Sequence, residues 1–147
     1  AMTTVHPGYT LLDGPPDVAD YLRLRRETGM SPKTEEQAEA GTHGAWAALR
    51  VRHDASGETV GMGRVIGDGG WYFHVIDMAV LPEHQGQGLG GAVLDRLLET
   101  IRTSTPPGAY VSLMADRPGQ ALHAGRGFTD PAPLTKGMTM WLDDSRG

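Results

Sequence analysis

The sequence contains no cysteine among its 147 residues, which excludes disulfide scaffolds, thiolate zinc sites and cysteine nucleophiles. Positive charge is also scarce, because 13 Lys and Arg stand against 18 Asp and Glu, giving a net charge of −5 and a pI near 5.6. A surface for nucleic acid or anionic lipid needs the opposite balance. No uncharged apolar run approaches the roughly 20 residues that cross a bilayer. These absences predict a protein that binds neither nucleic acid nor membrane.

Domain organisation is predicted from length and from further absences. The chain has no internal repeat, no low-complexity tract and no Pro/Gly-rich linker. A chain of this length can bury a core without staples, so we expect a single domain over residues 1–147. The opening segment AMTTVHPGYT lacks the basic and apolar regions of a signal peptide, so we expect a cytoplasmic location.

The first third of the chain predicts one short strand and two helices. The strand is expected over residues 9–12, and PPDVADYLRLRRETG reads as a helix that ends at Gly29. One face of that helix carries Val18, Tyr21, Leu22 and Arg25. The segment SPKTEEQAEAG predicts a second helix, with Ser31 as the N-cap and Gly41 as the stop.

The rest of the chain alternates strand and helix patterns. Two strand-like runs, residues 44–54 and 58–68, are joined by ASG, which predicts a hairpin. The apolar run GGWYFHVIDMAVLP suits a central strand, and an amphipathic helix follows near residues 89–101. A strand in PPGAYVSLMAD, a short helix in PGQALHAGRGF and a final strand in GMTMWLD complete the series. We therefore predict an α/β fold with a central mixed sheet of six to seven strands and about four helices.

A cluster of glycines stands at the start of the amphipathic helix, within HQGQGLGG. Gly86, Gly88 and Gly91 spell G-x-G-x-x-G, the dinucleotide fingerprint. In a dinucleotide-binding unit these glycines follow the strand at once, and an acidic residue comes about 20 positions later. Here residues 81–85 intervene, TSTPPGAYVSL holds no acid, and no Gly-Lys-Ser/Thr of a P-loop follows. The sequence therefore argues against both nucleotide motifs.

Two interpretations of the glycines remain. They can form a turn that lets the helix pack closely on the strand. They can also form an anion cradle, because a helix N-terminus offers unpaired N–H groups and partial positive charge, and glycines let successive amides curl around a phosphate.

Residues 85–90, Gln-Gly-Gln-Gly-Leu-Gly, match the pattern Q/R-x-x-G-x-G/A. This pattern is the pyrophosphate loop of the GNAT superfamily of acyl-CoA-dependent N-acyltransferases, which the sequence resembles. The strand ending VLPE, the loop and the amphipathic helix follow the family order. The segment from Leu122 to Phe128 resembles the family's L-Y-x-x-x-G-F. The resemblance extends from about Tyr9 to Leu142.

The resemblance implies acetyl-CoA as co-substrate, no metal, and direct acetyl transfer to the primary amine of a small molecule. It implies that the strand before the loop offers backbone groups to the cofactor at Met78, Ala79 and Val80, with the Met78 N–H as oxyanion donor. It also implies that backbone amides hold the pyrophosphate. These are the amides of Gln85, Gly86, Gln87, Gly88, Leu89, Gly90 and Gly91.

The same resemblance suggests proton-transfer groups. His74 lies where several family members carry a carboxylate base; the alternative is a histidine that only hydrogen-bonds within the sheet. His123 stands where the family has a tyrosine, as acid and cofactor contact. Asp116 replaces a family asparagine at the cofactor, and Arg117 can offset its negative charge.

Asp77 interrupts an apolar strand, which is costly for a carboxylate without a partner. It can bind the acceptor ammonium, act as base, or pair with an arginine such as Arg64, and the structural pair is slightly favoured. For the acceptor pocket, the family fold points to Glu27 and Met30 and the aromatic run points to Trp71 and Phe73; the alternative for these two aromatic residues is a place in the core. A CoA-binding sensor without turnover is the alternative function, and a homodimer is a further expectation from the family.

Overall fold

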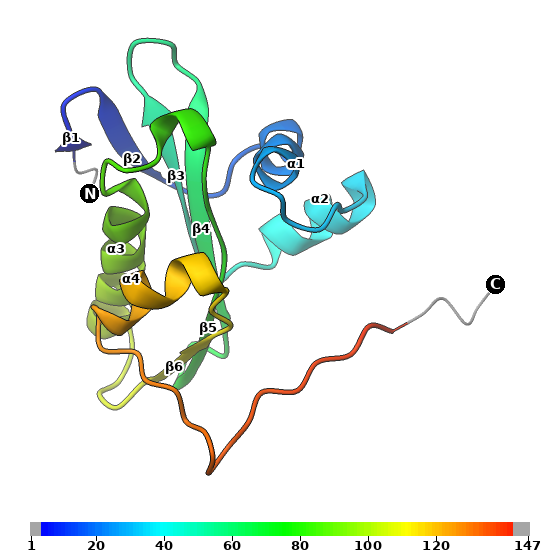
Figure 1. Cartoon of the computed structure of the whole chain (residues 1–147), viewed down its shortest axis with the longest axis vertical. Helices are drawn as coiled ribbons and strands as arrows, with labels where there is room; N and C mark the ends of the chain where they lie inside the picture. The colour runs from blue at the N-terminus through cyan, green and yellow to red at the C-terminus, as the bar shows by residue number, and fades with distance from the viewer. Residues whose placement is uncertain (1–3, 143–147) are drawn as a thin grey trace. The chain divides into compact units, whose positions relative to one another are not determined.

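The computed structural model describes residues 4–142, with side chains from residue 7 onward. The chain divides into two compact units, with the boundary between Leu113 and Met114. The first unit holds the sheet and three helices, and the second holds a short helix and an extended segment (Figure 1). Each unit is described on its own below.

The first unit is built on a single mixed sheet in the order β1-β2-β3-β4-β5-β6. Its strands are β1 Thr4–His6, β2 Tyr9–Asp13, β3 Ala47–His53, β4 Thr59–Gly67, β5 Tyr72–Val80 and β6 Tyr110–Leu113. Neighbouring strands are antiparallel except β5 and β6, which are parallel. Five strands have four or more residues, and β1 is a three-residue edge strand. The predicted α/β class, the mixed sheet and the hairpin from β3 to β4 are confirmed.

The helices α1 (Val18–Glu27) and α2 (Glu35–His43) follow β2. The predicted start and stop of α2 are wrong. Its N-cap is Thr34, whose hydroxyl accepts from the Gln37 amide while the Gln37 side chain accepts from the Thr34 amide. This capping box satisfies two amides at once, whereas Ser31 offers no such partner three residues later. Gly41 lies inside the helix, which ends at His43 with Gly44 as its C-cap.

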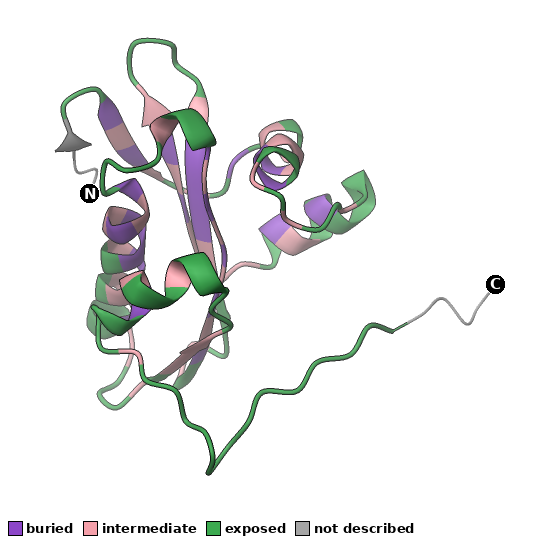
Figure 2. Cartoon of the chain, in the orientation of Figure 1, coloured by how far each residue is buried: buried purple, intermediate pink, exposed green. Residues whose placement is uncertain are grey.

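Helix α3 (Leu89–Ser104) covers one face of the sheet, and α1 and α2 lie on the other (Figure 1). The predicted apolar stripe faces the sheet, with Val93, Leu94 and Leu97 fully buried. Buried residues follow β3, β4, β5 and the sheet-facing side of α3 (Figure 2). Each fully buried Leu or Val contributes about 1.5–3 kcal/mol, so α3 is a main source of stability.

The second unit contains the 3₁₀ turn η2 (Arg117–Gly119) and helix α4 (Gln120–Ala124). The predicted final strand is wrong, because residues 137–142 have no regular secondary structure. Asp143, the last residue of that predicted strand, lies outside the described residues. Met138, Met140, Trp141 and Leu142 are exposed. A strand requires a hydrogen-bonded neighbour, and no strand of the described residues pairs with this segment.

Among the described residues, none of the helices has both the length and the apolar character needed to cross a membrane.

Candidate functional site

The glycine-rich loop leads directly into α3. Gly86 and Gly88 have φ angles of +79° and +78°, in the left-handed region that favours glycine. Gly88 is the N-cap of α3 and offers no side chain to the first turn. Among the described residues, no backbone or side-chain acceptor receives the amides of residues 86–91, whereas the Ala92 amide already donates to Gly88. The loop therefore presents six unpaired amides at the positive end of a sixteen-residue helix.

Side chains from β2 and η1 (Pro82–His84) hold one flank of this loop. The side-chain nitrogen Nε2 of Gln87 donates to the Tyr9 hydroxyl at 3.1 Å, and that hydroxyl lies 2.6 Å from Nδ1 of His84. A phenol can accept one hydrogen bond and donate another, so both contacts can form together. The Tyr9 ring also packs edge-on against His84. On the other side, the Gln85 side chain donates to the Val80 carbonyl at 2.9 Å. These bonds tie the loop to β2 and to the end of β5.

Strand β5 has an irregularity next to Met78, Ala79 and Val80, the residues whose backbone is expected to contact the cofactor. Between β4 and β5 the register shifts, so that Gly63 faces both Asp77 and Met78. A Cβ on Gly63 would lie 2.6 Å from the Met78 sulfur, which explains the glycine there. On the opposite edge, the pairing with β6 stops at Val75. Within residues 4–113, the β6 side of β5 from Ile76 to Val80 has no strand partner.

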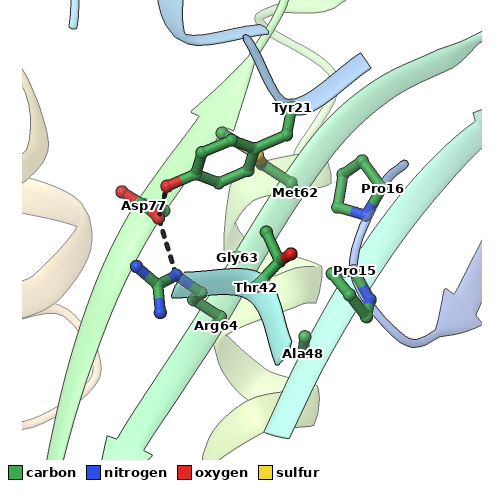
Figure 3. A pocket seen from close by; sticks show the side chains of 9 residues that line it. All are labelled: Pro15, Pro16, Tyr21, Thr42, Ala48, Met62, Gly63, Arg64 and Asp77. Carbon is green, nitrogen blue, oxygen red and sulfur yellow. Dashed lines mark hydrogen bonds and ion pairs between the residues drawn. The ribbon is translucent and has the colours of Figure 1, made fainter. Parts of the chain in front are cut away.

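Asp77 is buried at the centre of a charged cluster (Figure 3). Its Oδ1 accepts from Arg25 at 2.6 Å and its Oδ2 accepts from Arg64 at 2.7 Å. The Tyr21 hydroxyl donates to Oδ2 as well. Burial raises the pKa of Tyr21, and the hydrogen bond to the Asp77 carboxylate raises it further. The predicted structural pair with Arg64 is confirmed, and both carboxylate oxygens are engaged.

This cluster borders a shallow hollow between the sheet and the helices α1 and α2 (Figure 3). It is lined by Pro15, Pro16, Tyr21, Thr42, Ala48, Met62, Gly63, Arg64 and Asp77. Although burial alone lowers the pKa of Arg64, the hydrogen bond and charge of Asp77 outweigh it and raise that pKa. The guanidinium is therefore charged at all physiological pH values.

His74 lies on β5, three residues before Asp77, and is half-buried. Its Nδ1 is 2.8 Å from the Ser112 hydroxyl on β6, and the parallel pairing places these two residues side by side. Burial lowers the pKa of His74 below its ordinary value of 6.5. A neutral imidazole with one nitrogen engaged leaves the other available as a proton acceptor. The geometry is compatible with the base role and also with a histidine that serves the sheet alone.

The aromatic run at the start of β5 is divided between core and surface. Phe73 has 0% exposure and packs against Trp46, so the prediction that it contacts the acceptor is wrong. Trp71 is 60% exposed, and its ring meets Tyr72, which in turn meets Tyr110 of β6. Trp71 precedes the strand, and within β5 the alternation of side chains places Tyr72 and Phe73 on opposite faces.

The residues predicted at the acceptor lid belong to α1 and the segment after it. Glu27 is exposed in the last turn of α1 and lies 3.9 Å from Arg23. Met30 is half-buried in the connection to α2. Two hydrogen bonds from Arg25 of α1 stabilise that connection. Its Nε donates to the Ser31 carbonyl, and a terminal nitrogen donates to the Ser31 hydroxyl.

The second unit holds the remaining predicted residues. Asp116 caps η2, where its carboxylate accepts from the Gly119 amide, and Arg117 is exposed beside it. His123 is only 9% exposed, packs edge-on against Phe128, and its Nδ1 has no partner within the described residues. Burial lowers the pKa of His123; the charge of Asp116 opposes this shift and Arg126 adds to it.

Comparison with known proteins decides the family. Residues 16–128, well over half of the chain, match the acetyltransferase (GNAT) family. The chain belongs to the GNAT acetyltransferase family. The match runs through the glycine loop and ends at Phe128, the last residue of the Leu122–Phe128 segment, so it is shorter at both ends than the resemblance expected from about Tyr9 to Leu142. No curated protein sequence matches the chain.

Solved GNAT structures have the same fold. A protein of unknown function from methicillin-resistant Staphylococcus aureus, described as a probable acetyltransferase, is 36% identical over 91% of this chain and 99% of its own, with a TM-score of 0.85. A GNAT protein from Streptococcus pneumoniae is 21% identical over 92% and 98%, with a TM-score of 0.74. Glucosamine-6-phosphate N-acetyltransferase from Arabidopsis thaliana is 16% identical over 92% and 99%, with a TM-score of 0.68. The last two similarities concern the fold alone.

Some residues of this GNAT site were not found from the sequence. Ser112 contacts His74, Tyr9 contacts the loop through Gln87, and Tyr21 and Arg25 contact Asp77, and each of these four residues lies far from its partner in the chain. One signal was present for the last pair, because Tyr21 and Arg25 share the inward face of α1. Within the described residues, no group of three or more His, Cys, Asp or Glu is gathered for a metal ion.

Proposed function

We propose that this GNAT protein is an acetyl-CoA-dependent N-acetyltransferase that acetylates the primary amine of a small molecule. The observation that carries the proposal is the set of six unpaired amides at residues 86–91, next to the unpaired edge of β5. Oriented amides at a helix N-terminus suit a pyrophosphate, and they do so in an acidic protein without a cluster of lysines. The left-handed Gly86 and Gly88 leave room for an anion close to the backbone.

The cofactor would be held at both of these features. The amides from Gln85 to Gly91 would grip the pyrophosphate, and the backbone of Met78, Ala79 and Val80 would pair with the pantetheine arm. The Val80 carbonyl already accepts from Gln85, so that side chain would have to exchange this bond when the arm enters. When bound, acetyl-CoA supplies an acetyl group activated as a thioester.

His74 would remove the proton from the attacking amine. Its Nδ1 is engaged by Ser112, which leaves Nε2 as the candidate base, and its lowered pKa keeps the ring neutral at pH 7. The amine nitrogen would form the C–N bond as the C–S bond breaks, with the carbonyl oxygen stabilised by the Met78 N–H.

The departing thiolate needs a proton. His123 remains a proposed donor, but its lowered pKa reduces the imidazolium population at neutral pH. We therefore expect His123 to donate only at lower pH, and solvent to supply the proton above it. Asp116 and Arg117 remain proposed contacts of the cofactor.

The acceptor would approach from the face of the sheet that carries the exposed aromatic residues near His74. Trp71 and Tyr72 offer an apolar surface, and Tyr72 is linked to His74 through Ser112. This supports an amine with an apolar or aromatic group. Glu27 and Met30 would line the lid. Asp77 is assigned neither base nor acceptor role, because three donors already occupy its oxygens.

The test is free-thiol release from acetyl-CoA in the presence of a panel of primary amines, with propionyl- and butyryl-CoA as alternative donors. We expect thiol release that depends on the amine, and none when Gly88 is replaced by valine. A protein that binds CoA in calorimetry but releases no thiol with any amine contradicts the proposal and supports the CoA sensor. The homodimer expected from the family is tested separately by sedimentation.

A further inference from the structure

Asp77 has an unusual backbone for a strand residue. Its φ is +61°, the only positive value for a non-glycine residue within the part of the chain that the structure describes. Side chains other than glycine adopt this region at a cost, and aspartate tolerates it better than most. The residue lies at the bulge of β5, opposite Gly63. A strained residue that persists in a strand must be held by its surroundings.

The side chain of Asp77 provides that hold. Arg25 of α1 binds Oδ1, whereas Oδ2 accepts from Tyr21 of α1 and from Arg64 of β4, so the carboxylate is tied to two elements. With only 5% exposure, the carboxylate would be very costly to bury without these partners. Together, the three donors fix the position of the Asp77 side chain.

The cluster also reaches the segments on the acceptor side. Arg25 binds Ser31 in the connection between α1 and α2, and Arg64 donates to the Gly41 carbonyl in α2 at 2.9 Å. The two arginines therefore link the bulge of β5 to both helices that cover this face. Met78, whose N–H is the proposed oxyanion donor, is the residue directly after Asp77.

We propose that Asp77 is a positioning residue, which Tyr21, Arg25 and Arg64 pin in the left-handed conformation so that the bulge presents the Met78 N–H to the thioester carbonyl. This inference rests on the proposed acetyl transfer. It assigns Asp77 to the reaction through the backbone of its neighbour, with no contact to substrate. It also predicts that movement of α1 or α2 on acceptor binding is transmitted to the Met78 amide.

The test compares three variants of the full chain. Asp77→Asn keeps the size and tolerates the left-handed φ but loses the charge. Asp77→Gly adopts φ +61° freely but has nothing to pin. The control, Asp54→Asn, removes a carboxylate that pairs with Arg52 in the turn before β4. We expect both Asp77 variants to lower kcat by about a hundredfold, the size expected from a misplaced reacting geometry. We expect acetyl-CoA affinity by calorimetry to fall far less than kcat, because the glycine loop that would grip the pyrophosphate is untouched and only the contact at Met78 is disturbed.

Loss of the buried carboxylate can also unfold the protein, so Tyr21→Phe is added as a milder variant. It removes one of the three donors and leaves both ion pairs, and we expect a smaller fall in kcat of about tenfold, in keeping with the loss of one hydrogen bond to a charged group. A wild-type kcat in folded Tyr21→Phe and Asp77→Gly overturns the inference. So does a parallel loss of kcat and CoA affinity, which indicates a general structural role.

A second readout separates this inference from the proposed function. The ¹H–¹⁵N signal of the Met78 amide is measured in the free protein, where no turnover is needed. We expect Asp77→Asn and Tyr21→Phe to shift it and Asp54→Asn to leave it unchanged. If the wild-type protein acetylates no amine, the proposed function fails, and the Met78 signal still decides the positioning role. A Met78 signal that none of the variants moves overturns the inference even in an active enzyme.

Discussion

The imidazole Nδ1 of His74 lies 2.8 Å from the hydroxyl of Ser112, across the parallel pair of β5 and β6. The same hydroxyl lies 3.5 Å from the Phe73 carbonyl, which can accept its proton. We expect Nδ1–H of His74 to donate to Ser112 and Ser112 to donate to that carbonyl, so that Nε2 keeps its lone pair. Ser112 would then fix the tautomer that a general base needs.

Replacement of Ser112 by alanine tests this arrangement. We expect kcat to fall by about ten- to a hundredfold, part of the contribution that a general base makes. The ¹⁵N shifts of His74 should report a mixture of tautomers in place of one. Ser112→Thr is the control, because it keeps the hydroxyl and threonine suits a strand. An alanine variant with a single Nδ1–H tautomer and wild-type kcat contradicts the role.

The pH profile tests His74 itself. Burial lowers its pKa, so the neutral, basic form is populated at lower pH than for an exposed histidine. The rate should therefore rise with pH through a limb below pH 6.5 and be level by neutral pH. We expect His74→Ala to lower kcat by about 10²-fold or more and to remove that limb. His43→Ala, at an exposed histidine of α2, should keep the profile. A limb that survives in His74→Ala assigns the base elsewhere.

The parts predicted well from the sequence share one property, which is that their signals are local. The stripe of α3 and the turn between β3 and β4 each depend on residues within a short window. The glycine loop is also local, since the pattern from Gln85 to Gly90 needs no distant partner to be found. The pairing of Asp77 with Arg64 was predicted because a carboxylate in an apolar strand needs a counter-charge.

Two of the parts that were missed, the partner of His74 and the placement of Phe73, depend on how the strands of the sheet are arranged. Ser112 is one polar residue in a short strand, and only the pairing of β5 with β6 places it beside His74. The prediction that Phe73 contacts the acceptor failed for a similar reason. The face of the sheet on which a β5 side chain lies, and whether that face is covered, depend on the elements packed around the strand, here including Trp46. The start of α2 was missed although its signal was local, since Thr34 and Gln37 form the capping box that the sequence TEEQ spells.

The glycine loop gives a sharp binding prediction. Gly88→Val places a β-branched side chain at φ +78°, beside the unpaired amides. We expect CoA binding to be lost, because the side chain fills the space next to the backbone and the strain distorts the loop. Gly57→Val is the matched control, with φ +71° in the turn before β4 and nothing near its Cβ. Both variants carry a similar strain of about 1–3 kcal/mol, and only the first should fail to bind in calorimetry. Equal affinities in the two variants contradict the cradle.

The hydroxyl of Tyr9 is expected to stabilise the loop without contact to the cofactor. Tyr9→Phe removes the bonds to Gln87 and His84 and keeps the ring. We expect CoA affinity to fall by about three- to tenfold, which matches the net worth of about one hydrogen bond. Tyr110→Phe, at an exposed tyrosine, should leave the affinity unchanged. An unchanged affinity in Tyr9→Phe shows that the loop holds its shape without this support.

Alanine substitutions at two glycines, Gly63 opposite the bulge of β5 and Gly41 in α2, should change the free energy of unfolding in opposite directions. A Cβ on Gly63 would lie 2.6 Å from the Met78 sulfur and 2.7 Å from Val93, so Gly63→Ala should lower the free energy of unfolding by about 1–3 kcal/mol. Gly41 lies inside α2 with only ordinary contact to Arg64, so Gly41→Ala should raise that free energy by up to about 1 kcal/mol. Urea unfolding measures both. Because Gly63 faces Met78, its alanine variant should also lose kcat, whereas a stable and fully active Gly63→Ala would mean that the bulge can move without effect on the reaction.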